Sequence, residues 1–280
     1  GAYCGSACGR RRGENMGCEL LLFDIGNTAV KIGLADARRV VASYTLHTDV
    51  GQTADNLGLT LLPLLQHAGV TPGQLVGCVA SSVVPGFDPL LREAVARYLD
   101  RPLHRVGKDL PVPLENRYER PCEVGADRLV GAYAARRLFP EVPSILVVDF
   151  GTAVTLDCVS GDAYLGGLIF PGPRTALAAL SGAAAKLPRI NLDVRATEPS
   201  PGRNTSTSMR HGLVFGFASM VEGLVQRLKR QLSGPVKVLG TGGFADAIAR
   251  VSPVFDQVAP MLLLEGLRRL YYEQRDTLDR

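Results

Sequence analysis

Two aspartates occupy the same place in a pattern that the chain uses twice. Asp24 lies in "LLLFDIGNTAVKIGLAD", residues 20 to 36, and Asp149 lies in "ILVVDFGTAVTLD", residues 145 to 157. In both copies an apolar run ends at the aspartate, and a glycine two residues later precedes amide or hydroxyl side chains. Such a glycine lets the backbone approach a ligand closely, and amide and hydroxyl groups can donate hydrogen bonds to phosphate oxygens. The pattern predicts a phosphate-binding turn after a buried strand.

A carboxylate beside a phosphate is tolerable only when a cation is there too. The two aspartates therefore indicate a bound magnesium or monovalent ion with carboxylate and water ligands. A single Asp-x-Gly sequence also arises from the ordinary turn preferences of these residues, so a turn without function is the alternative for one copy. Because the two copies are 125 residues apart and each follows an apolar run, we favour a doubled hairpin that clamps phosphate.

The residues around these turns predict the elements that must hold them. Runs of strand length alternate with segments of helical periodicity, which implies an α/β architecture. The predicted strands are Leu20–Phe23, Leu75–Ser81, Ile145–Asp149, Tyr164–Phe170 and Lys237–Leu239, and the predicted helices are Asp88–Leu99, Ala126–Phe139 and His211–Leu232. The repeat predicts two similar halves, each beginning with the aspartate hairpin. We expect a boundary near residue 140, at "FPEVPS", where prolines end a helix before the next strand.

Composition and charge narrow the class of protein. With 280 residues, 46% of them hydrophobic and 21% charged, the chain is typical of a soluble globular protein with one large or two ordinary domains. The first fifteen residues hold three arginines and one glutamate, and we interpret them as a disordered leader or a cloning remnant, with Met16 as the expected start. From Met16 onward the net charge is +2, which does not indicate a nucleic-acid-binding surface. We find no signal peptide and no apolar stretch of about 18 residues, and therefore predict a cytoplasmic protein without membrane contact.

Zinc, disulfide and common nucleotide motifs do not occur. The four cysteines after Met16 are scattered without a C-x-x-C pair, and the four histidines share no spacing that would form a zinc site or a catalytic triad. The glycine-rich "VLGTGGFADAIA", residues 238 to 249, follows a predicted strand and places backbone amides at the start of a helix. It lies too late in the chain to begin a Rossmann domain, and no P-loop occurs. Nucleotide binding therefore requires another fold.

Six ordered motifs are similar to those of one kinase family. They are "DIGNTAVK" at 24 to 31, "ENRYERPCEVGADRLVGAYAA" at 115 to 135, "VVDFGTAVTLD" at 147 to 157, "YLGGLIFPG" at 164 to 172, "GRNTSTSMRHGLVFG" at 202 to 216 and "GTGGFA" at 240 to 245. From Glu19 to about Leu270 the chain resembles type III pantothenate kinase. The first and third motifs alone indicate only the superfamily of acetate and sugar kinases, heat-shock ATPases and actin. The resemblance implies two similar actin-like (ribonuclease H-like) domains, each with a mixed sheet flanked by helices, at residues 16–140 and 141–280.

The resemblance also implies an activity. Type III pantothenate kinases phosphorylate pantothenate with ATP and give 4'-phosphopantothenate, the first step of coenzyme A biosynthesis. The alternative is a non-catalytic ATP-binding regulator related to the Bvg accessory factor, although a regulator has no need of an acceptor base. The implied cofactors are ATP as co-substrate, magnesium, and potassium or ammonium as a monovalent cation. A homodimer with a shared active site is expected, and the apolar helical stretch 210 to 228 fits it, with an ordinary buried helix as the alternative.

Matching positions give each predicted site residue a role. Asp127 matches the catalytic base, since phosphorylation of an alcohol needs a carboxylate that orients the hydroxyl and accepts its proton. Asp149 matches the ligand of the monovalent cation, and Asp24 is a candidate magnesium ligand through water. The predicted ATP-binding residues are Asp24, Ile25, Gly26, Asn27, Thr28, Ala29, Val30, Lys31 and Thr152. The predicted substrate-binding residues are Tyr118, Gly125, Ala126, Asp127, Arg128 and Thr205.

Several of these residues also have an interpretation without function. Asp127 and Arg128 could be an exposed pair at a helix start, where such pairs stabilise little. Tyr118 could be a half-buried packing aromatic with its hydroxyl at the surface. Thr205 could cap a helix, and Thr152 could serve its turn alone.

Overall fold

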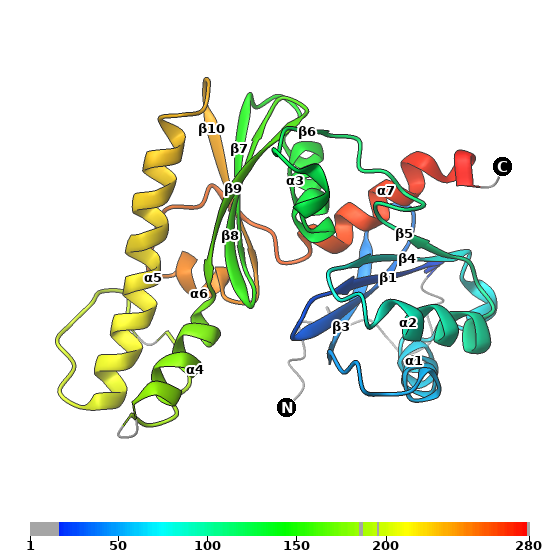
Figure 1. The fold of residues 1–280 in the computed structure, drawn as a ribbon, viewed down its shortest axis with the longest axis horizontal. Helices are drawn as coiled ribbons and strands as arrows, with labels where there is room; N and C mark the ends of the chain where they lie inside the picture. The colour runs from blue at the N-terminus through cyan, green and yellow to red at the C-terminus, as the bar shows by residue number, and fades with distance from the viewer. Residues whose placement is uncertain (1–16, 185–186, 195, 279–280) are drawn as a thin grey trace. The chain divides into compact units, whose positions relative to one another are not determined.

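The computed structural model describes residues 17–184, 187–194 and 196–278, and these fall into two compact units. The first unit takes its residues from Gly1–Pro113, Cys122–Ala134 and Leu263–Arg280, and the second from Leu114–Pro121 and Ala135–Leu262. Each unit holds one sheet (Figure 1). The predicted leader, residues 1 to 15, lies outside the described residues.

The first sheet has five strands in the order β3-β2-β1-β4-β5. They are β1 (Leu20–Ile25), β2 (Ala29–Ala35), β3 (Val40–His47), β4 (Gly77–Ser82) and β5 (Leu103–Arg105). β1 pairs antiparallel with β2, and β2 with β3, while β1, β4 and β5 run parallel. The sheet is therefore mixed, and its three parallel strands end at the same edge.

The helices of the first unit pack on both faces of this sheet. They are α1 (Ala54–His67), α2 (Asp88–Ala94) and α7 (Leu262–Leu278), with a π-helical turn (Val95–Leu99) and short 3₁₀ turns at Pro72–Gln74 and Pro121–Glu123. α3 (Ala126–Leu138) begins in the first unit, and its residues from Ala135 belong to the second. α1 begins after Thr53, whose side chain accepts a hydrogen bond from the backbone N–H of Asn56. α2 and its π-helical turn together cover the predicted helix 88–99.

Alternation along β1 assigns these faces, because successive side chains of a strand point to opposite sides. Leu21 and Phe23 lie in the core cluster that α1 and α2 complete. Asp24 points to the other side, where Gly33 of β2 lies so close to Leu264 of α7 that an added side-chain carbon would be 3.2 Å from it. Asp24 therefore shares its face of the sheet with α7.

α7 also fastens the turn between β2 and β3. Glu265 accepts a hydrogen bond from the backbone N–H of Val40 (2.7 Å), and Arg268 donates one to the backbone carbonyl of Ala37 (2.6 Å). Gly266 lets α7 approach α3 closely, since a side chain there would meet α3. Residues late in the sequence thus complete the first unit.

The second sheet repeats the first and adds one short strand. Its order is β11-β10-β7-β8-β9-β6, and its directions in β7 to β11 match those of the first sheet. The strands are β6 (Glu115–Asn116), β7 (Ser144–Phe150), β8 (Ala153–Ser160), β9 (Ala163–Pro171), β10 (Val236–Gly242) and β11 (Gln257–Val258). The two units therefore have the same core topology.

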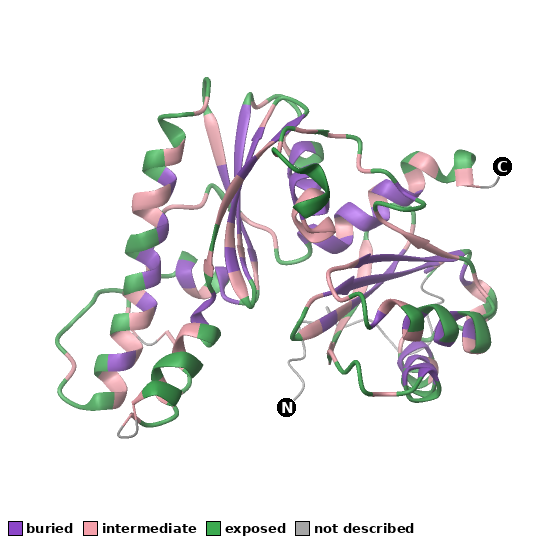
Figure 2. Cartoon of the chain, in the orientation of Figure 1, coloured by how far each residue is buried: buried purple, intermediate pink, exposed green. Residues whose placement is uncertain are grey.

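In the described part of the chain, three helices lie wholly in the second unit, α4 (Pro173–Ala183), α5 (Thr205–Lys229) and α6 (Ala245–Ala249). Leu146 and Val148 of β7 lie in one core cluster with Phe217 and Val221 of α5. Figure 2 shows β7 and β8 almost continuously buried, whereas α5 alternates between buried and exposed residues. α5 therefore contributes one face to the core of its unit and leaves another exposed.

The observed elements confirm the predicted fold class and the type of every predicted strand and helix, and all bounds except those of α5 agree within a few residues. α5 begins earlier than predicted, because Asn204 caps it at that point. The prediction lacked α1, which contains Pro63, and also α4 and α7. Each unit is built from separate segments of the chain, so no single point in the sequence divides them. The boundary near residue 140 stays a prediction. None of the described helices is long and apolar enough to cross a membrane.

Candidate active site

The β1–β2 hairpin places a carboxylate and an amine on one face of the first sheet. Asp24, the residue before the end of β1, is only 8% exposed and pairs in register with Lys31 of β2. Residues opposite each other on neighbouring strands share a face, and here Lys31 Nζ lies 4.0 Å from Asp24 Oδ2. Ser81 of β4 pairs with Asp24 on the other side. A row of three polar side chains therefore crosses the sheet at the hairpin.

The tip of this hairpin is held closed while its side chains stay exposed. The backbone N–H of Gly26 donates to the carbonyl of Ala29 (3.0 Å). Thr48, just after β3, donates its Oγ1 hydrogen to the carbonyl of Gly26 (2.6 Å). Asn27 and Thr28 at the tip are exposed. The exposed amide and hydroxyl groups are thus presented by a backbone that is fixed from behind.

α3 begins with the sequence that holds the predicted base. Asp127 lies in its first turn, where the helix dipole favours negative charge, and its Oδ1 accepts a hydrogen bond from the backbone N–H of Arg128 (2.8 Å). Gly125 leaves room for this carboxylate, because a side-chain carbon on residue 125 would meet Asp127 Oδ1. Gly125 therefore contributes by having no side chain where the Asp127 carboxylate lies.

Burial raises the pKa of the Asp127 carboxyl above its ordinary value. The backbone amide and the charge of Arg128, and the charge of Lys31, act in the opposite direction and lower this pKa. Lys31 therefore acts electrostatically on both Asp24 and Asp127, and all three residues belong to the first unit. A carboxyl group with a raised pKa beside a charged pair is a candidate for proton transfer.

The β7–β8 hairpin holds Asp149 at the same place in the second sheet. Asp149 pairs in register with Thr155 of β8 and with Thr241 of β10. The backbone N–H of Gly151 donates to the carbonyl of Ala153 (3.0 Å), which closes a tip that is one residue shorter than the first. Gly151 is exposed, as is Thr152 beside it.

The end of the third strand also holds this second tip. Gly172, just after β9, donates its backbone N–H to the carbonyl of Thr152 (2.9 Å), and Thr175 donates its Oγ1 hydrogen to the same oxygen (2.6 Å). A side chain on residue 172 would collide with the hairpin backbone. Thr48 plays the corresponding part in the first sheet. Neither Thr48 nor Thr175 was a predicted site residue, since only the strand register reveals what they hold.

The glycine-rich turn after β10 packs against Asp149. Gly242 has a φ of 87°, in the left-handed region that favours glycine. A side-chain carbon there would also meet Asp149 Oδ1 and would lie 2.6 Å from the backbone N and O of Phe150. The turn leads directly into α6, as predicted, and its glycine leaves the space that the Asp149 carboxylate occupies.

Tyr118 lies at the edge of the second sheet, two residues after the end of β6. The backbone N–H of Arg117 donates to the carbonyl of Tyr164 (2.9 Å), which holds this segment on β9. The rings of Tyr118 and Tyr164 have centroids 6.4 Å apart. Tyr118 is half-buried, so part of its ring is open to contact.

Thr205 is the first residue of α5, and its neighbour caps the helix. The Asn204 side chain accepts a hydrogen bond from the backbone N–H of Thr207 (2.9 Å). Asn204 therefore fills the capping role that was the alternative for Thr205. Thr205 itself is exposed.

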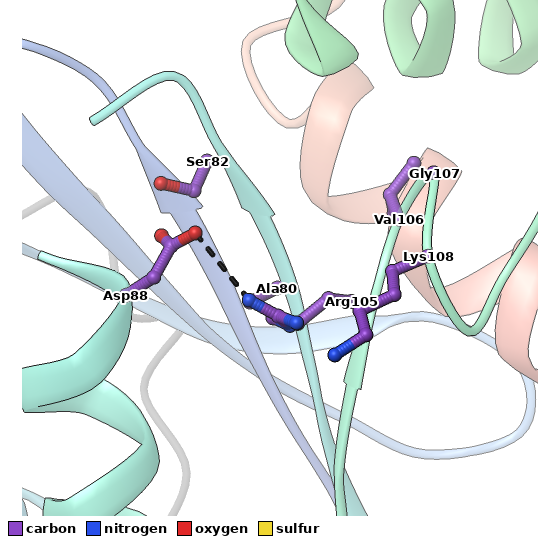
Figure 3. A pocket seen from close by; sticks show the side chains of 7 residues that line it. All are labelled: Ala80, Ser82, Asp88, Arg105, Val106, Gly107 and Lys108. Atoms are coloured by element: carbon purple, nitrogen blue, oxygen red, sulfur yellow. Dashed lines mark ion pairs between the residues drawn. The ribbon is translucent and has the colours of Figure 1, made fainter. Parts of the chain in front are cut away.

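A polar pocket of about 270 Å³ lies at the ends of β4 and β5 in the first unit (Figure 3). Its lining residues are Ala80, Ser82, Asp88, Arg105, Val106, Gly107 and Lys108. Figure 3 shows Arg105 directed at Asp88, with 3.6 Å between Nη1 and Oδ2. The pocket contains none of the predicted site residues, and the Arg105 side chain in it is paired with Asp88.

The predicted site residues thus divide between the two units. The first unit holds the hairpin 24–31 together with Gly125, Ala126, Asp127 and Arg128, and the second holds Tyr118, Asp149, Thr152 and Thr205. Among the described residues, no three or more His, Cys, Asp or Glu side chains gather to form a metal site. Single carboxylates fit an ion whose other ligands are water and phosphate.

Comparisons with known proteins identify the family. The family model described as type III pantothenate kinase matches residues 20–227. The type III pantothenate kinase of Desulfovibrio desulfuricans is 80% identical over 257 residues, which are 92% of this chain and 98% of that protein. That of Oleidesulfovibrio alaskensis is 62% identical over 253 residues, 90% of this chain and 96% of that protein. A Baf family protein from Campylobacter jejuni, 19% identical, has a TM-score of 0.57 over 91% of this chain and 99% of its own, and shows the fold alone. The chain belongs to the type III pantothenate kinase family.

Proposed function

We infer that the chain transfers the γ-phosphoryl group of ATP to the primary hydroxyl of pantothenate, giving 4'-phosphopantothenate in the first step of coenzyme A biosynthesis. The observation that carries this inference is membership of the type III pantothenate kinase family over most of the chain. Two similar aspartate hairpins and a carboxyl group of raised pKa at a helix start support a kinase mechanism. We place the reaction in the cytoplasm, where ATP is available.

Asp127 acts as the base in this proposal. Its carboxylate orients the hydroxyl of pantothenate and accepts the proton as the hydroxyl oxygen attacks the γ-phosphorus. A pKa raised by burial makes the carboxylate a better proton acceptor than an exposed aspartate. Gly125 leaves the space in which the carboxylate lies.

The β1–β2 hairpin binds the phosphates of ATP. Asn27 and Thr28 are exposed at its tip, and Lys31 supplies a positive charge beside Asp24. Asp24 would hold magnesium through water, since one carboxylate with water and phosphate oxygens is a ligand set that magnesium prefers. When bound, magnesium neutralises charge on the phosphate oxygens. Ile25, Gly26, Ala29 and Val30 shape the hairpin, and Thr152 contributes from the second tip.

Asp149 binds the monovalent cation, potassium or ammonium. Its partner across the hairpin is Thr155, a neutral residue, where the first hairpin has Lys31. A cation bound there would supply the charge that Lys31 supplies in the first unit. Gly242 supports this assignment only by leaving the space in which the Asp149 carboxylate itself lies.

The remaining residues recognise pantothenate. The guanidinium of Arg128 suits the carboxylate of pantothenate, because it can donate two parallel hydrogen bonds. Gly125 and Ala126 bring the backbone at the start of α3 to the substrate. Tyr118 and Thr205 supply a partly exposed ring and an exposed hydroxyl group.

A homodimer with a shared active site is part of the proposal. α5 carries Gly212, Gly216 and Gly223 on one face, and a side-chain carbon on any of them would meet no described atom within 4 Å. Met220 on the same face is 38% exposed. Small residues on an exposed helix face allow close packing against a second helix, and Thr205 begins this helix.

The shared site is tested by mixing two inactive variants, Thr205→Arg and Asp127→Asn. If each pocket combines Asp127 of one subunit with Thr205 of the other, a mixed dimer should regain about one intact pocket. No recovery despite proven subunit exchange would place both residues in the pocket of one chain. Light scattering that finds an active monomer at working concentration would also contradict the dimer.

The regulator alternative is not favoured, and one variant tests the enzyme directly. Asp127→Asn should keep the fold and lower turnover by about 10²- to 10⁴-fold, because the amide cannot accept the proton. Coupled release of ADP, with and without pantothenate, measures this, and Asp276→Asn, at an exposed side chain near the end of α7, is the matched control. Near wild-type turnover in Asp127→Asn would remove Asp127 from the mechanism. ADP release that ignores pantothenate in the wild type would favour the regulator.

A further inference from the structure

The strand that faces Tyr118 carries a β-bulge. In the pairing of β8 with β9, Cys158 pairs with Gly166 but Val159 pairs with Tyr164, so Leu165 is an extra residue. Gly166 has a φ of 108°, which strongly favours glycine. The bulge therefore puts a residue without a side chain on the surface of β9.

The ring of Tyr118 lies against this residue. A side-chain carbon on Gly166 would be 3.3 Å from Cδ2 and 3.4 Å from Cε2 of Tyr118, closer than the roughly 3.5–4.0 Å of relaxed carbon contacts. The backbone leading to the ring is fixed as well. Glu115 donates its N–H to the carbonyl of Asp162 (2.8 Å), and the N–H of Tyr118 donates to Asn116 Oδ1 (3.1 Å).

A buried carboxylate holds the neighbouring Tyr164 ring in place through a hydrogen bond. The hydroxyl of Tyr164 donates to Asp157 Oδ1 (2.8 Å), and Thr155 Oγ1 donates to Asp157 Oδ2 (2.9 Å). Asp157 is 2% exposed and Tyr164 fully buried, so these hydrogen bonds are shielded from water and hold both side chains in one arrangement. Thr155 is also the residue opposite Asp149. A polar chain therefore runs from the second hairpin to the side of Tyr118.

We propose that Gly166 is a positioning residue for pantothenate, because the Tyr118 ring packs on its bare backbone at the bulge. Tyr164, which is hydrogen-bonded to Asp157, packs beside the Tyr118 ring and supports this position. The proposal rests on the proposed function, in which Tyr118 contacts the substrate. A side chain at position 166 displaces the ring and weakens the use of pantothenate, while ATP binding at the hairpins is unaffected. If Gly166 serves only the backbone of the bulge, substitution changes stability and nothing else.

Kinetics separate these two roles. Gly166→Ala should lower kcat/KM for pantothenate about 10-fold, because a small misplacement of a substrate-contacting group is costly, and should leave KM for ATP within about 2-fold of wild type. Gly161→Ala is the matched control. Gly161 lies in the turn between β8 and β9, has a φ of 52°, and an added carbon there would meet nothing within 4 Å among the described residues. This control should keep both constants.

The position of the ring can be measured without turnover. The chain contains no tryptophan, so Tyr118→Trp introduces a single fluorescent reporter next to Gly166. Adding Gly166→Ala to this variant should shift the emission to longer wavelength as the ring leaves β9, whereas adding Gly161→Ala should not. Unchanged emission together with unchanged kcat/KM for pantothenate in folded Gly166→Ala would overturn the proposal.

A second variant serves if Gly166→Ala does not fold. Tyr164→Phe removes the hydrogen bond to Asp157 without changing the backbone, and should lower kcat/KM for pantothenate in the same direction by a smaller factor. Wild-type values of both kcat/KM and reporter emission in Tyr164→Phe would show that Tyr164 does not support the Tyr118 ring. If wild-type protein shows no pantothenate-dependent release of ADP, the proposed function fails. If the wild type shows that activity and the variants match it, only the positioning role of Gly166 is refuted.

Discussion

The two aspartate hairpins share their topology and differ in what faces the aspartate. The orders β3-β2-β1-β4-β5 and β9-β8-β7-β10-β11 correspond strand by strand. Within this common frame Asp24 faces Lys31, whereas Asp149 faces Thr155. One aspartate has a cation of the protein beside it, and the other has a neutral hydroxyl. The repeat has kept its geometry while the charges of its two copies have diverged.

The strand on the other side of each hairpin differs as well. Ile25 pairs with Ser82 of β4, and Phe150 pairs with Gly242 of β10. A side chain is present at the first position, while at the second it would meet the carboxylate of Asp149. In the second copy the aspartate carboxylate therefore packs directly on the glycine of the neighbouring strand.

Removing each aspartate should give the largest effect and test the division of roles. Asp24→Ala should lower magnesium-dependent turnover by about 100-fold or more, since the site loses a charged group that stabilises the transferring phosphates. Asp149→Ala should keep part of the turnover and lose the response to potassium and ammonium. Initial rates at varied magnesium and varied monovalent cation, normalised to folded protein, measure both effects.

Two outcomes would break that comparison. If Asp24→Ala changes thermal stability alone while turnover per folded molecule stays constant, the first hairpin is a turn without function. If both variants depend on the two kinds of cation as the wild type does, the hairpins do not divide the cations between them.

Exchanging the residues beside the hairpins should give an effect of intermediate size. Gly242→Ser should lower the free energy of unfolding by about 2 kcal/mol or more, because it combines a left-handed φ with a collision at Asp149. The reverse change, Ser82→Gly, should cost about 1 kcal/mol, chiefly the hydrogen bond between Ser82 and Val84. Urea unfolding of both variants measures the difference, and equal losses would mean that the two positions are not distinct.

The smallest expected shift is in the pH dependence of Lys31→Met, and it is measured apart from the weaker ATP binding that loss of this charge should cause. The positive charge of Lys31 lowers the pKa of Asp127, against the larger rise caused by burial. Lys31→Met should therefore raise that pKa further, and the acid limb of kcat/KM for pantothenate should move to higher pH by less than about one unit. Lys237→Met, at a lysine paired with Asp256 in the second unit, is the matched control. A shift to lower pH in Lys31→Met would contradict the assigned electrostatics.

The hairpins could be predicted from sequence because each is a local pattern. Strand, aspartate, glycine and hydroxyl follow one another within a dozen residues, and the second copy shows that the first is not accidental. The strand assignments followed from apolar runs for the same reason. Asn204 was harder to distinguish from Thr205 as the helix cap, because both residue types fill that role, and only the hydrogen bond to Thr207 decides between them.

Contacts between distant parts of the chain could not be predicted. Lys31 and Asp127 lie far apart in sequence, and only the fold brings them near enough for one charge to act on the other. Gly166 and Gly242 both stand in glycine-rich motifs, yet one lies against the ring of Tyr118 and the other against the carboxylate of Asp149. The side chain that needs the space becomes known only when the register is known.

The return of α7 to the first unit constrains the order in which the protein can fold during synthesis. The main part of the second unit is one continuous run, residues 135 to 262, and can fold as soon as it leaves the ribosome. The first unit is made earlier but lacks α7, with Glu265 and Arg268, until residues 262 to 278 have emerged. Until then, the part of the sheet that α7 covers stays exposed to solvent in the growing chain.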